Sequence, residues 1–571
     1  MDAQQGSPDD WWRRGVVYQI YPRSFMDGNG DGVGDLAGVI ARLPYLKELG
    51  IDAIWFTPWY VSPFADGGYD VADYRRIDPR FGSLADAETL IQQAAGLGIR
   101  TIVDIVPNHV SDQHPWFQAA LASPPGSPER SRFWFRDGKG EDGSVMPTNW
   151  LSSFRGHTWT RTVNPDGSPG QWYLHLFTRE QPDLNWNNPD VRAEHEAILK
   201  FWFDRGAAGV RVDSAALIIK DPTLPDDDPE IGATDGRHPF IDRDETHDIY
   251  RAWRKLADSY SPPRILVGEV WLEDQSRFAA YLRPDEMHMA FNFDFMTRPW
   301  DAAQLRASIE LTLAAHAAVD APATWVLSNH DITRPVTRYG RSDTSFSFAQ
   351  KRFGAPANLA LGTRRARAAF TLCAALPGSL YIYQGDELGL PEDEELPVEA
   401  IEDPMYFRSN GADPGRDGCR VPLPWQSDPA GNFGFSLSPD DGNPAPSWLP
   451  QPAWWGRYAV AAENDNPSSM LNFYRHVLAL RREMTDFTTA PLVWIDGLPA
   501  TCLGFRRGDI VCLVNFGPQT EPLPPGEVLI TSQPVERGAI APDTAVWIMQ
   551  PGSAALPGHG SPKTGRPGEG G

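Results

Sequence analysis

Cysteine and long apolar segments are both scarce in this sequence. The 571 residues include only four cysteines, which lie far apart at positions 373, 419, 502 and 512. Because no Cys-x-x-Cys pair or other metal-ligand spacing is present, we expect reduced and mostly buried thiols. No apolar run approaches the roughly 20 residues that a membrane helix needs, and the polar N-terminal stretch lacks the apolar segment of a secretory signal. We therefore expect a soluble, cytoplasmic protein with no membrane partner.

Basic residues are outnumbered by acidic ones. Lys and Arg total 51 against 75 Asp and Glu, so the formal net charge is −24. A surface this acidic repels phosphate backbones and anionic lipids, which argues against a nucleic-acid partner or a polybasic membrane contact. The chain is long enough to bury a large core. Its 21 Trp residues suit either core packing or a pocket that stacks on sugar rings, and composition alone does not choose between the two.

The central pattern is an alternation of short β-rich runs with amphipathic helical stretches. Val and Ile dominate the β-rich runs, as is typical of parallel strands buried on both faces. Several helical stretches end in Gly directly before the next run, which is a common helix stop signal. The predicted helical stretches are residues 36–50, 83–98, 191–206, 302–319 and 469–484. The predicted strands are residues 16–22, 51–58, 99–109, 209–215, 264–271, 287–295, 323–331 and 378–387. Eight such strands with helical crossovers predict an α/β fold of the (β/α)8, or TIM-barrel, type.

Three regions depart from this alternation. Residues 110–184, after the third strand, are too long and polar for an ordinary loop and predict an inserted subdomain over the carboxyl ends of the strands. The catalytic barrel is then expected to comprise residues 11–109 and 185–485. Short strands separated by turn signals predict an all-β sandwich domain over residues 486–551, and the low-complexity tail 552–571 is expected to be disordered.

Charged side chains interrupt the apolar strands at their carboxyl ends, where parallel barrels place their active sites. The fourth strand carries Arg211 and Asp213, the fifth ends at Glu269 and the seventh at Asp331. Carboxylates crowded into one concave mouth cannot all ionise at their usual pKa values, so one stays protonated near neutrality. A nucleophile and an acid are then available together, as retaining glycoside hydrolysis requires. One such carboxylate alone would more simply pair with Arg or cap a helix, but three on three strands favour catalysis.

Four short segments on these strands resemble the signature segments of the α-amylase family of retaining glycoside hydrolases. They are DIVPNH at 104–109, GVRVDSA at 209–215, the Glu of GEVW at 268–271 and SNHD at 328–331, in the family's order on strands three, four, five and seven. QPDLNW at 181–186 resembles a fifth segment that is typical of the oligo-1,6-glucosidase and α-glucosidase branch. The resemblance extends over nearly the whole chain.

The resemblance implies a role for each strand-end carboxylate. Asp213 is expected to be the nucleophile that forms a β-glycosyl ester, and Glu269 the general acid that later acts as a base and activates water. Asp331 is expected to bind ring hydroxyls and to distort the sugar toward the oxocarbenium-like transition state. Arg211, two residues before Asp213 and therefore on the same strand face, should keep Asp213 ionised.

Further residues are expected to bind the sugar. By the same resemblance, His109 and His330 are ligands to hydroxyl groups in the first subsite. GGYD at 67–70 resembles the segment whose Asp binds the non-reducing-end glucose in exo-acting members, so Asp70 would close the pocket and single glucose units would be released. Arg420, in CRVPLPW where α-glucosidases usually have a pattern closer to ARTPMQW, resembles the Arg that pairs with this Asp.

A separate loop after the first strand alternates oxygen-bearing side chains with glycines. It reads Asp27-Gly-Asn29-Gly-Asp31-Gly-Val33-Gly-Asp35. This spacing lets a loop wrap a hard cation, as in the first half of an EF-hand, but the twelfth position is Gly38 where an EF-hand needs Glu. The loop resembles the structural cation loop of this branch, with Val33 contributing its backbone carbonyl. Calcium is favoured and magnesium is an alternative, a plain Gly/Asp turn is the competing interpretation, and no organic cofactor is implied.

The residue after the predicted nucleophile bears on the choice of linkage. In this branch, Val at that position accompanies α-1,6 cleavage, whereas Ala or Thr accompanies α-1,4 cleavage. Ser214 is neither, but it is small and polar like Thr. We therefore expect an exo-acting α-glucosidase whose partner is a small α-glucoside or oligosaccharide, preferably α-1,4-linked.

Three other functions stay open. The overall resemblance also fits an oligo-1,6-glucosidase, which Ser214 disfavours. A glucosyl-transferring or isomerising relative, such as a trehalose synthase, shares the covalent intermediate but keeps water out. Some barrels of this family are non-catalytic interaction proteins that have lost the carboxylates and gained a membrane helix. Because this sequence has all three carboxylates and no apolar run of that length, the non-catalytic function ranks last.

Overall fold

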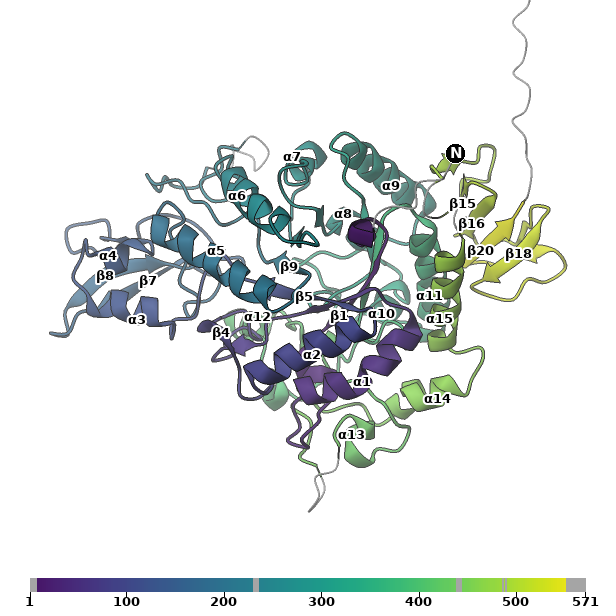
Figure 1. Cartoon of the computed structure of the whole chain (residues 1–571), viewed down its shortest axis with the longest axis horizontal. Coiled ribbons are helices and arrows are strands. Elements are labelled where there is room, and N and C mark those ends of the chain that lie inside the picture. The colour runs from purple at the N-terminus through teal and green to yellow at the C-terminus, as the bar shows by residue number, and fades with distance from the viewer. Residues whose placement is uncertain (1–7, 229–235, 438–443, 485–486, 488–489, 551–571) are drawn as a thin grey trace, which may run out of the picture.

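Eight parallel strands form the central sheet of the computed structural model, which describes residues 8–228, 236–437, 444–484, 487 and 490–550. Their order is β11-β10-β9-β5-β2-β1-β13-β12. The strands are β1 (Val16–Ile20), β2 (Ala53–Phe56), β5 (Arg100–Ile105), β9 (Gly209–Val212), β10 (Ile265–Gly268), β11 (Met289–Ala290), β12 (Thr324–Val326) and β13 (Ser379–Tyr383). Each predicted strand contains one of them, so the predicted (β/α)8 barrel is confirmed (Figure 1). The predicted tail 552–571 lies outside the described residues.

Alternate strand residues point into the barrel and form a core of their own. Seven strands contribute to this inner cluster, among them β1 with Val17, β2 with Ala53, β5 with Ile102, β10 with Val267 and β13 with Tyr381. A strand period of two residues places their chain neighbours on the opposite face of the sheet. The barrel interior is therefore a packed apolar core and not an open channel.

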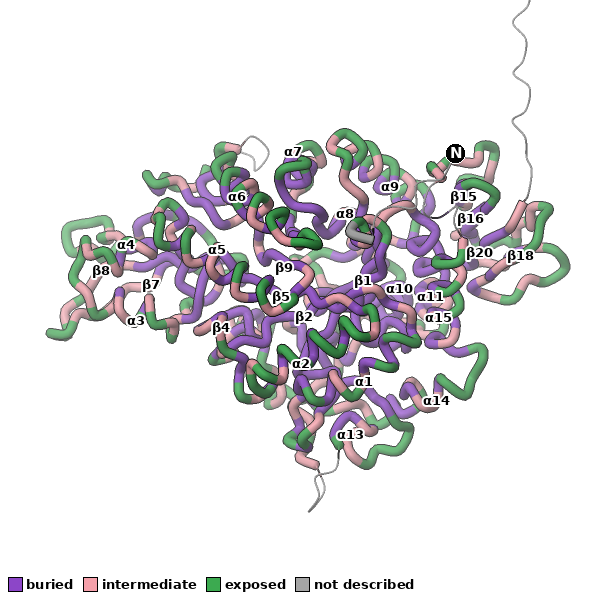
Figure 2. Tube along the Cα trace, in the orientation of Figure 1, coloured by how far each residue is buried: buried purple, intermediate pink, exposed green. Residues whose placement is uncertain are grey.

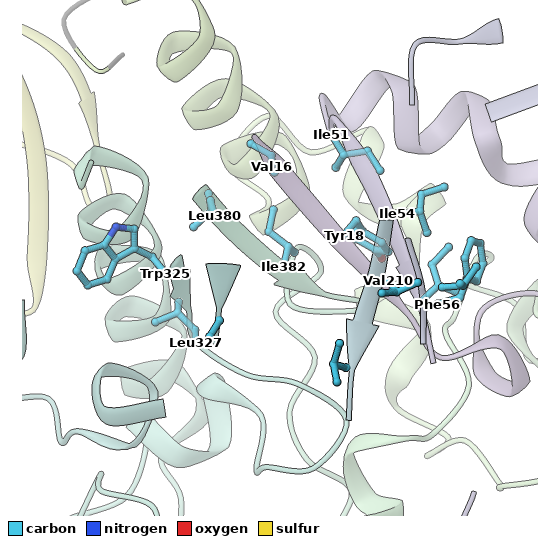
Figure 3. Packing of buried hydrophobic residues seen from close by; sticks show 14 of the residues in the cluster. Val16, Tyr18, Ile51, Ile54, Phe56, Val210, Trp325, Leu327, Leu380 and Ile382 are labelled. Carbon is cyan, nitrogen blue, oxygen red and sulfur yellow. The ribbon is translucent and has the colours of Figure 1, made fainter. Parts of the chain in front are cut away.

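The outward-facing strand residues pack beneath the surrounding helices. In Figure 3, Val16, Tyr18, Ile54, Leu380 and Ile382 lie together as part of the largest hydrophobic cluster. Figure 2 shows the central strands buried along their lengths, while the helices around them alternate buried and exposed positions. Burial on both faces accounts for the nearly continuous apolar runs that predict these strands.

Amphipathic helices cover the sheet. Those that the sequence predicts are α1 (Leu36–Leu49), α2 (Leu84–Gly96), α5 (Pro189–Asp204), α9 (Ala302–Ala317) and α15 (Met470–Glu483). α1 ends at Gly50, whose φ of 92° is in the left-handed region that favours glycine. Two more barrel helices, α6 (Thr246–Asp258) and α11 (Leu359–Ala375), are absent from the sequence prediction. α11 contacts β12 on one side and the C-terminal sheet on the other, so its sequence lacks a single apolar stripe.

The inserted subdomain after β5 is present and is anchored to the next loop of the barrel. It contains α3 (Pro115–Ala122), α4 (Pro128–Ser131) and an antiparallel sheet in the order β6 (Phe135–Arg136), β8 (Pro169–Leu174) and β7 (Trp159–Val163). Trp134, Trp150 and Trp159 pack with Leu224 and Phe240, which belong to the loop after β9. This contact fixes the subdomain beside the carboxyl ends of the strands.

The C-terminal β domain is also confirmed and lies at the opposite end of the molecule from the insert (Figure 1). Its five-stranded antiparallel sheet has the order β14 (Val493–Trp494), β15 (Cys502–Arg507), β16 (Ile510–Asn515), β20 (Thr544–Met549) and β18 (Glu527–Thr531). Trp547 on one face donates its indole N–H to Thr371 O of α11 at 3.1 Å. On the other face Val511 and Ile548 pack with Ile540 of a two-stranded ribbon, β17 (Glu521–Pro522) with β19 (Ala539–Ile540).

Shorter elements complete the described chain. They are β3 (Tyr60–Val61), β4 (Asp73–Ile77), α7 (Gln275–Ala280), α8 (Phe293–Thr297), α10 (Pro335–Tyr339), α12 (Pro404–Arg408), α13 (Ala430–Gly434), α14 (Val460–Asn464) and the 3₁₀ turns Pro8–Arg13, Pro22–Ser24, Val398–Ala400, Asp417–Cys419 and Trp455–Tyr458. None of the helices in the described ranges is long and apolar enough to cross a membrane. All four cysteines are free thiols, and all but Cys502 are buried, as predicted.

A side chain closes the barrel between its two end strands. β11 and β12 stand at the ends of the sheet order, and Thr324 Oγ1 of β12 donates a 2.5 Å hydrogen bond to Ala290 O of β11. Thr324 is fully buried, so no water can replace this bond without a rearrangement.

We predict that Thr324→Val lowers the free energy of unfolding by about 1–3 kcal/mol, because it leaves the buried Ala290 carbonyl without this donor. Urea unfolding followed by tryptophan fluorescence measures the loss. The control is Thr371→Val in α11, whose hydroxyl bonds Arg367 O, a carbonyl that keeps its helical N–H partner. An equal loss in both variants would contradict a closing role for Thr324.

Candidate active site

The inward-facing positions of the strands change from apolar to polar as the carboxyl ends are reached. On β1, Val17 of the inner core is followed on the same face by Gln19, and on β5 Ile102 is followed by Asp104. The strand register then places Arg211 of β9 directly beside Asp104. The last inward layer of the barrel therefore forms the floor of a polar site, at the end of the barrel where the loops can reach it.

Arg211 is the centre of a cluster of buried carboxylates. Its Nη1 lies 2.6 Å from Asp213 Oδ1 and 3.1 Å from both oxygens of Asp104, and its Nη2 lies 2.7 Å from Glu269 Oε2. All four side chains are buried. One guanidinium thus brings together the predicted nucleophile, which follows β9, and the predicted acid, which follows β10.

Burial and shared charge set the ionisation of this cluster. Desolvation raises the pKa of Asp213 to about 6 and the pKa of Glu269 to about 7, although Arg211 lowers both. Asp331 and Asp213 each raise the pKa of Glu269 further, and burial likewise raises the pKa of Asp104 to about 7. Near neutrality Asp213 therefore loses its proton before Glu269 does. An ionised carboxylate and a carboxylic acid can therefore coexist at the ends of neighbouring strands.

Two N–H donors hold the Glu269 carboxyl in place. The backbone N–H of Ser214 donates to Oε2 at 2.9 Å, and the indole N–H of Trp271 donates to Oε1 at 3.0 Å. Ser214 has a φ of 45°, in the left-handed region that is strained for a residue other than glycine. Such strain concentrates at functional sites, and here it accompanies an N–H aimed at Glu269.

Asp331 stays ionised for the opposite reason. Burial raises its pKa, but the guanidinium groups of Arg416 and Arg420 lower the pKa of Asp331 well below its usual range. Asp331 Oδ1 lies 3.0 Å from Arg416 Nη1 and 3.3 Å from Arg420 Nη2. With two guanidinium groups on one carboxylate, Asp331 can accept hydrogen bonds from a ligand across the pH range in which Glu269 titrates.

The two predicted histidines line the pocket and are neutral. Burial lowers the pKa of His109 to about 4 and holds the pKa of His330 well below its usual value. His330 Nδ1 lies 2.7 Å from Gln19 Nε2. Since an amide nitrogen only donates, Nδ1 accepts and the proton of the neutral ring is on Nε2. Tyr69 stacks on His330 with ring centroids 5.3 Å apart, which fixes the plane of the imidazole.

A pocket of about 370 Å³ opens above this floor, within the size range of small-ligand sites. Asp213, Glu269, Asp331, His109 and His330 line its inner part, and Arg211 lies below them. Its rim comes from the insert, the loop after β9, the loop after β12 and the long segment after β13. The rim residues are Ser153, Phe154, Phe177, Ala216, Leu217, Ile241, Phe348 and Met405.

The predicted pairing of Asp70 with Arg420 is wrong. Asp70 is fully buried away from the pocket, where its carboxylate accepts hydrogen bonds from Ser62 Oγ at 2.9 Å and from the backbone N–H groups of Ala65 and Asp66 at 2.9 and 3.1 Å. It therefore stabilises the turn at 65–70. Arg420 lies behind the site, where its Nε donates to His330 O at 2.9 Å.

The pair that crosses the pocket is Asp66 with Arg416, each four residues before the predicted partner. Arg416 Nη2 lies 2.6 Å from Asp66 Oδ1, and Arg416 Nη1 lies 3.0 Å from Asp331 Oδ1. Asp403, from the acidic segment after β13, accepts from Arg416 Nε at 2.5 Å. The sequence offers two candidates for each member of this pair, because an Asp stands on each side of residues 67–69 and an Arg on each side of residues 417–419. The spacing alone does not indicate which Asp and which Arg face the pocket.

A second buried ion pair is absent from the sequence prediction. Lys220 Nζ lies 2.7 Å from Asp183 Oδ2 of the insert and 2.6 Å from Asn108 Oδ1 on the segment after β5. Asn108 Nδ2 in turn lies 3.1 Å from His109 Nδ1. The pair fastens the insert to the strand that carries His109. A lysine within the apolar run ALIIKD is the signal that could have identified it.

The predicted cation loop is held by its own backbone. Asp27 Oδ1 accepts from the N–H groups of Asn29 and Gly30, Asp27 Oδ2 accepts from Gly32, and Asp35 caps α1 by accepting from Gly38. Gly32 has a φ of 89°, and a Cβ there would meet Pro446 O at 2.1 Å, so the loop needs this glycine whether or not an ion binds. The atoms of this loop that could bind a cation are all oxygens, which suits a hard cation. Within the described residues, no three His, Cys, Asp or Glu side chains are arranged to hold a metal.

Known proteins match nearly the whole chain. A model described as the alpha amylase catalytic domain matches residues 19–490, and a domain of unknown function matches residues 493–547. The protein named "Probable alpha-glucosidase" from Rhizobium meliloti is 35% identical over 543 residues, which is 90% of this chain and 92% of that relative. The oligo-1,6-glucosidase of Parageobacillus thermoglucosidasius is 34% identical over 506 residues, 83% of this chain and 84% of that relative. The crystal structure of an alpha-glucosyl transfer enzyme has a TM-score of 0.79 at 34% identity and covers 95% of this chain and 99% of that chain.

We predict that Arg416→Ala destabilises the fold by about 3–5 kcal/mol at pH 7.5, because it strands buried carboxylates without their cation. In the native protein Arg416 and Arg420 lower the pKa of Asp403 to about 2 despite burial, so that stabilisation is present above pH 4 and is lost as the pH falls toward 2. When Arg416 is absent, burial should raise the pKa values of the carboxyl groups that it contacted. The loss in the free energy of unfolding should therefore become smaller as these groups take up protons toward pH 5. Urea unfolding at both pH values, with Arg416→Lys as the charge-retaining control, measures this. A deficit that does not change with pH would contradict it.

Proposed function

The chain belongs to the α-amylase family of glycoside hydrolases, and from that premise we propose that it is an exo-acting α-glucosidase. It would release glucose from the non-reducing end of small α-glucosides, with a preference for α-1,4 linkages, by a retaining mechanism. The observation that carries this proposal is the joint binding of Asp213 and Glu269 by the guanidinium of Arg211 at the floor of the pocket.

In the first step, Asp213 Oδ attacks the anomeric carbon while Glu269 gives its proton to the glycosidic oxygen. The glycosidic C–O bond breaks, and the leaving group departs as a neutral alcohol. Because Asp213 Oδ1 and Glu269 Oε2 lie on the two terminal nitrogens of one guanidinium, at 2.6 and 2.7 Å, the carboxylates are neighbours. This supports direct attack, for which retaining enzymes use a separation of about 5–5.5 Å.

In the second step, ionised Glu269 takes a proton from water, and the water oxygen attacks the anomeric carbon from the side that the leaving group left. The ester bond to Asp213 breaks, and its carboxylate returns to Arg211. Asp331 would accept hydrogen bonds from ring hydroxyls in both steps, and its low pKa, which Arg416 and Arg420 maintain against burial, keeps it ionised. Neutral His330 would donate from Nε2 to a third hydroxyl.

Exo action is supported by the Asp66–Arg416 bridge. Arg416 joins Asp66 to Asp331 on the wall of the pocket, and this bridge would block a chain that continues beyond a terminal sugar. Asp66 and Arg416 would also bind the outer hydroxyls of that sugar as a bidentate pair.

A second candidate function is favoured by specific relatives. One is named oligo-1,6-glucosidase, and a structural neighbour is named an alpha-glucosyl transfer enzyme. Both would use the same covalent intermediate and differ in the leaving group or in the acceptor. Ser214, which lines the pocket next to the nucleophile, favours α-1,4 cleavage because it is small and polar.

We also propose a cytoplasmic location, which is supported by the four free thiols, since oxidising compartments favour disulfides. The loop from Asp27 to Asp35 would bind calcium, with magnesium as the alternative. Carboxylate, amide and carbonyl oxygens are the donors that these ions take. The ion would be structural, because the loop packs against the segment after β13, where Trp448 N donates to Gly32 O at 3.0 Å.

Glucose release from maltose and isomaltose at equal concentration tests the function. We predict a higher kcat/KM for maltose, α-glucose as the first anomer seen by NMR, and a fall in kcat of roughly 10⁴-fold or more in Asp213→Asn. Circular dichroism of that variant provides the control for folding. Faster release from isomaltose would favour the oligo-1,6-glucosidase, transfer products without free glucose would favour the transferase, and β-glucose as the first anomer would contradict the retaining mechanism.

Metal analysis tests the cation loop. We predict one equivalent of calcium per chain after dialysis, and a lower Tm after EDTA treatment that is restored by added calcium. Saturation at about 100 times Kd would contribute about 2.7 kcal/mol. Asp31→Asn, at an exposed position of the loop, should weaken the calcium response and leave the apo fold intact. A protein that contains no metal and whose Tm does not change with EDTA or with calcium would contradict the proposed calcium site.

A further inference from the structure

We propose that Trp271 is a positioning residue for the acid/base Glu269, and that its indole N–H serves the carboxyl oxygen that gives up the proton. The inference rests on the proposed glucosidase function and adds to it the means by which proton transfer is controlled.

The two oxygens of Glu269 have different surroundings. Oε2 lies 2.7 Å from Arg211 Nη2 and accepts the Ser214 N–H at 2.9 Å. A cation and an N–H donor already face this oxygen, so a proton on it is disfavoured, because donors repel each other. Oε1 accepts only the Trp271 N–H, at 3.0 Å, among the bonds that the described residues make. The proton of the acid form therefore belongs on Oε1, with the indole N–H on its other lone pair.

The indole is itself held by aromatic rings. Trp271 stacks on Phe293 with centroids 3.5 Å apart and an interplanar angle of 13°, and the ring of Phe348 packs edge-on to it with centroids 5.3 Å apart. Phe293 is buried at the start of α8, whereas Trp271 lines the pocket and is 36% exposed. The ring of Phe293 supports one side of the indole and the pocket lies on the other. The N–H therefore has a fixed direction at the mouth of the pocket, where the leaving group would depart.

The consequence for the chemistry follows from charge. As Glu269 donates its proton, negative charge develops on Oε1, and a preorganised N–H stabilises that charge. A donor to the ionised form also lowers the pKa of a carboxyl, so the indole counteracts the effect of burial, which raises the pKa of Glu269 to about 7. Loss of the N–H should matter most when the leaving group needs full protonation.

Trp271→Phe keeps the aromatic stack and removes the N–H. With maltose, whose sugar leaving group needs the proton, we expect kcat/KM to fall about 10-fold, the effect of one lost hydrogen bond to a developing charge. With 4-nitrophenyl α-glucoside, whose nitrophenolate leaves with little protonation, we expect a change of less than about 2-fold. The basic limb of the pH profile for maltose should move up by about 1 pH unit, because Glu269 stays protonated to higher pH without the donor.

Two further variants keep the test sharp. Trp454→Phe removes an indole that is 41% exposed and outside the pocket residues, and it should leave both substrates and the pH profile unchanged. Phe293→Leu keeps the Trp271 N–H but removes the ring that supports the indole. It should move the basic limb of the pH profile in the same direction as Trp271→Phe, by a smaller amount. Equal losses on both substrates, or an unmoved basic limb in Trp271→Phe, would overturn the inference while wild-type glucose release upholds the function. Absence of wild-type release from either substrate would overturn both.

Discussion

The guanidinium of Arg211 is the interaction on which the rest of the site depends. Three buried carboxylates, Asp104, Asp213 and Glu269, lie within 3.1 Å of it. Charges buried in this way are tolerated only when they are paired and hydrogen-bonded, so this one cation permits the acids to be carried on adjacent strands. The same contact joins β5, β9 and the end of β10 in the last inward layer. The barrel that supports the site and the chemistry of the site therefore have a common origin.

The number of guanidinium groups in contact with a carboxylate then decides whether that acid is charged. Around Arg211 three carboxylates share one cation, and burial raises the pKa of Glu269 to about 7. Around Asp331 two guanidinium groups, from Arg416 and Arg420, serve one carboxylate at 3.0 and 3.3 Å. The first group retains a proton near neutrality, while the second does not. The segment after β13 creates this difference, since it supplies both arginines as well as Asp403, which neutralises Arg416 from behind.

The parts that the sequence predicts are those specified by local pattern. Buried parallel strands need unbroken apolar runs, so the sequence predicts all eight strands, with Asp213, Glu269 and Asp331 at their ends. The sequence does not predict contacts that depend on how the loops fold. The carboxylate of Asp70 turns back to accept the backbone N–H groups of Ala65 and Asp66, which leaves Asp66 free to reach Arg416, and no periodicity encodes that turn. Helix α11 escaped prediction because the C-terminal sheet buries the face that would otherwise be polar.

Under the proposed mechanism, the division between hydrolysis and transfer would lie outside this charged floor. Both outcomes would begin with the same ester, and both would use ionised Glu269 to take a proton from the incoming oxygen. That oxygen would enter where the leaving group left, past Trp271 and a rim that includes Phe154, Phe177 and Phe348. A rim of apolar side chains gives water few fixed partners and gives a larger acceptor more surface to contact. Relatives named for hydrolysis and for glucosyl transfer can therefore share a barrel, and the loops that surround the departing group distinguish them.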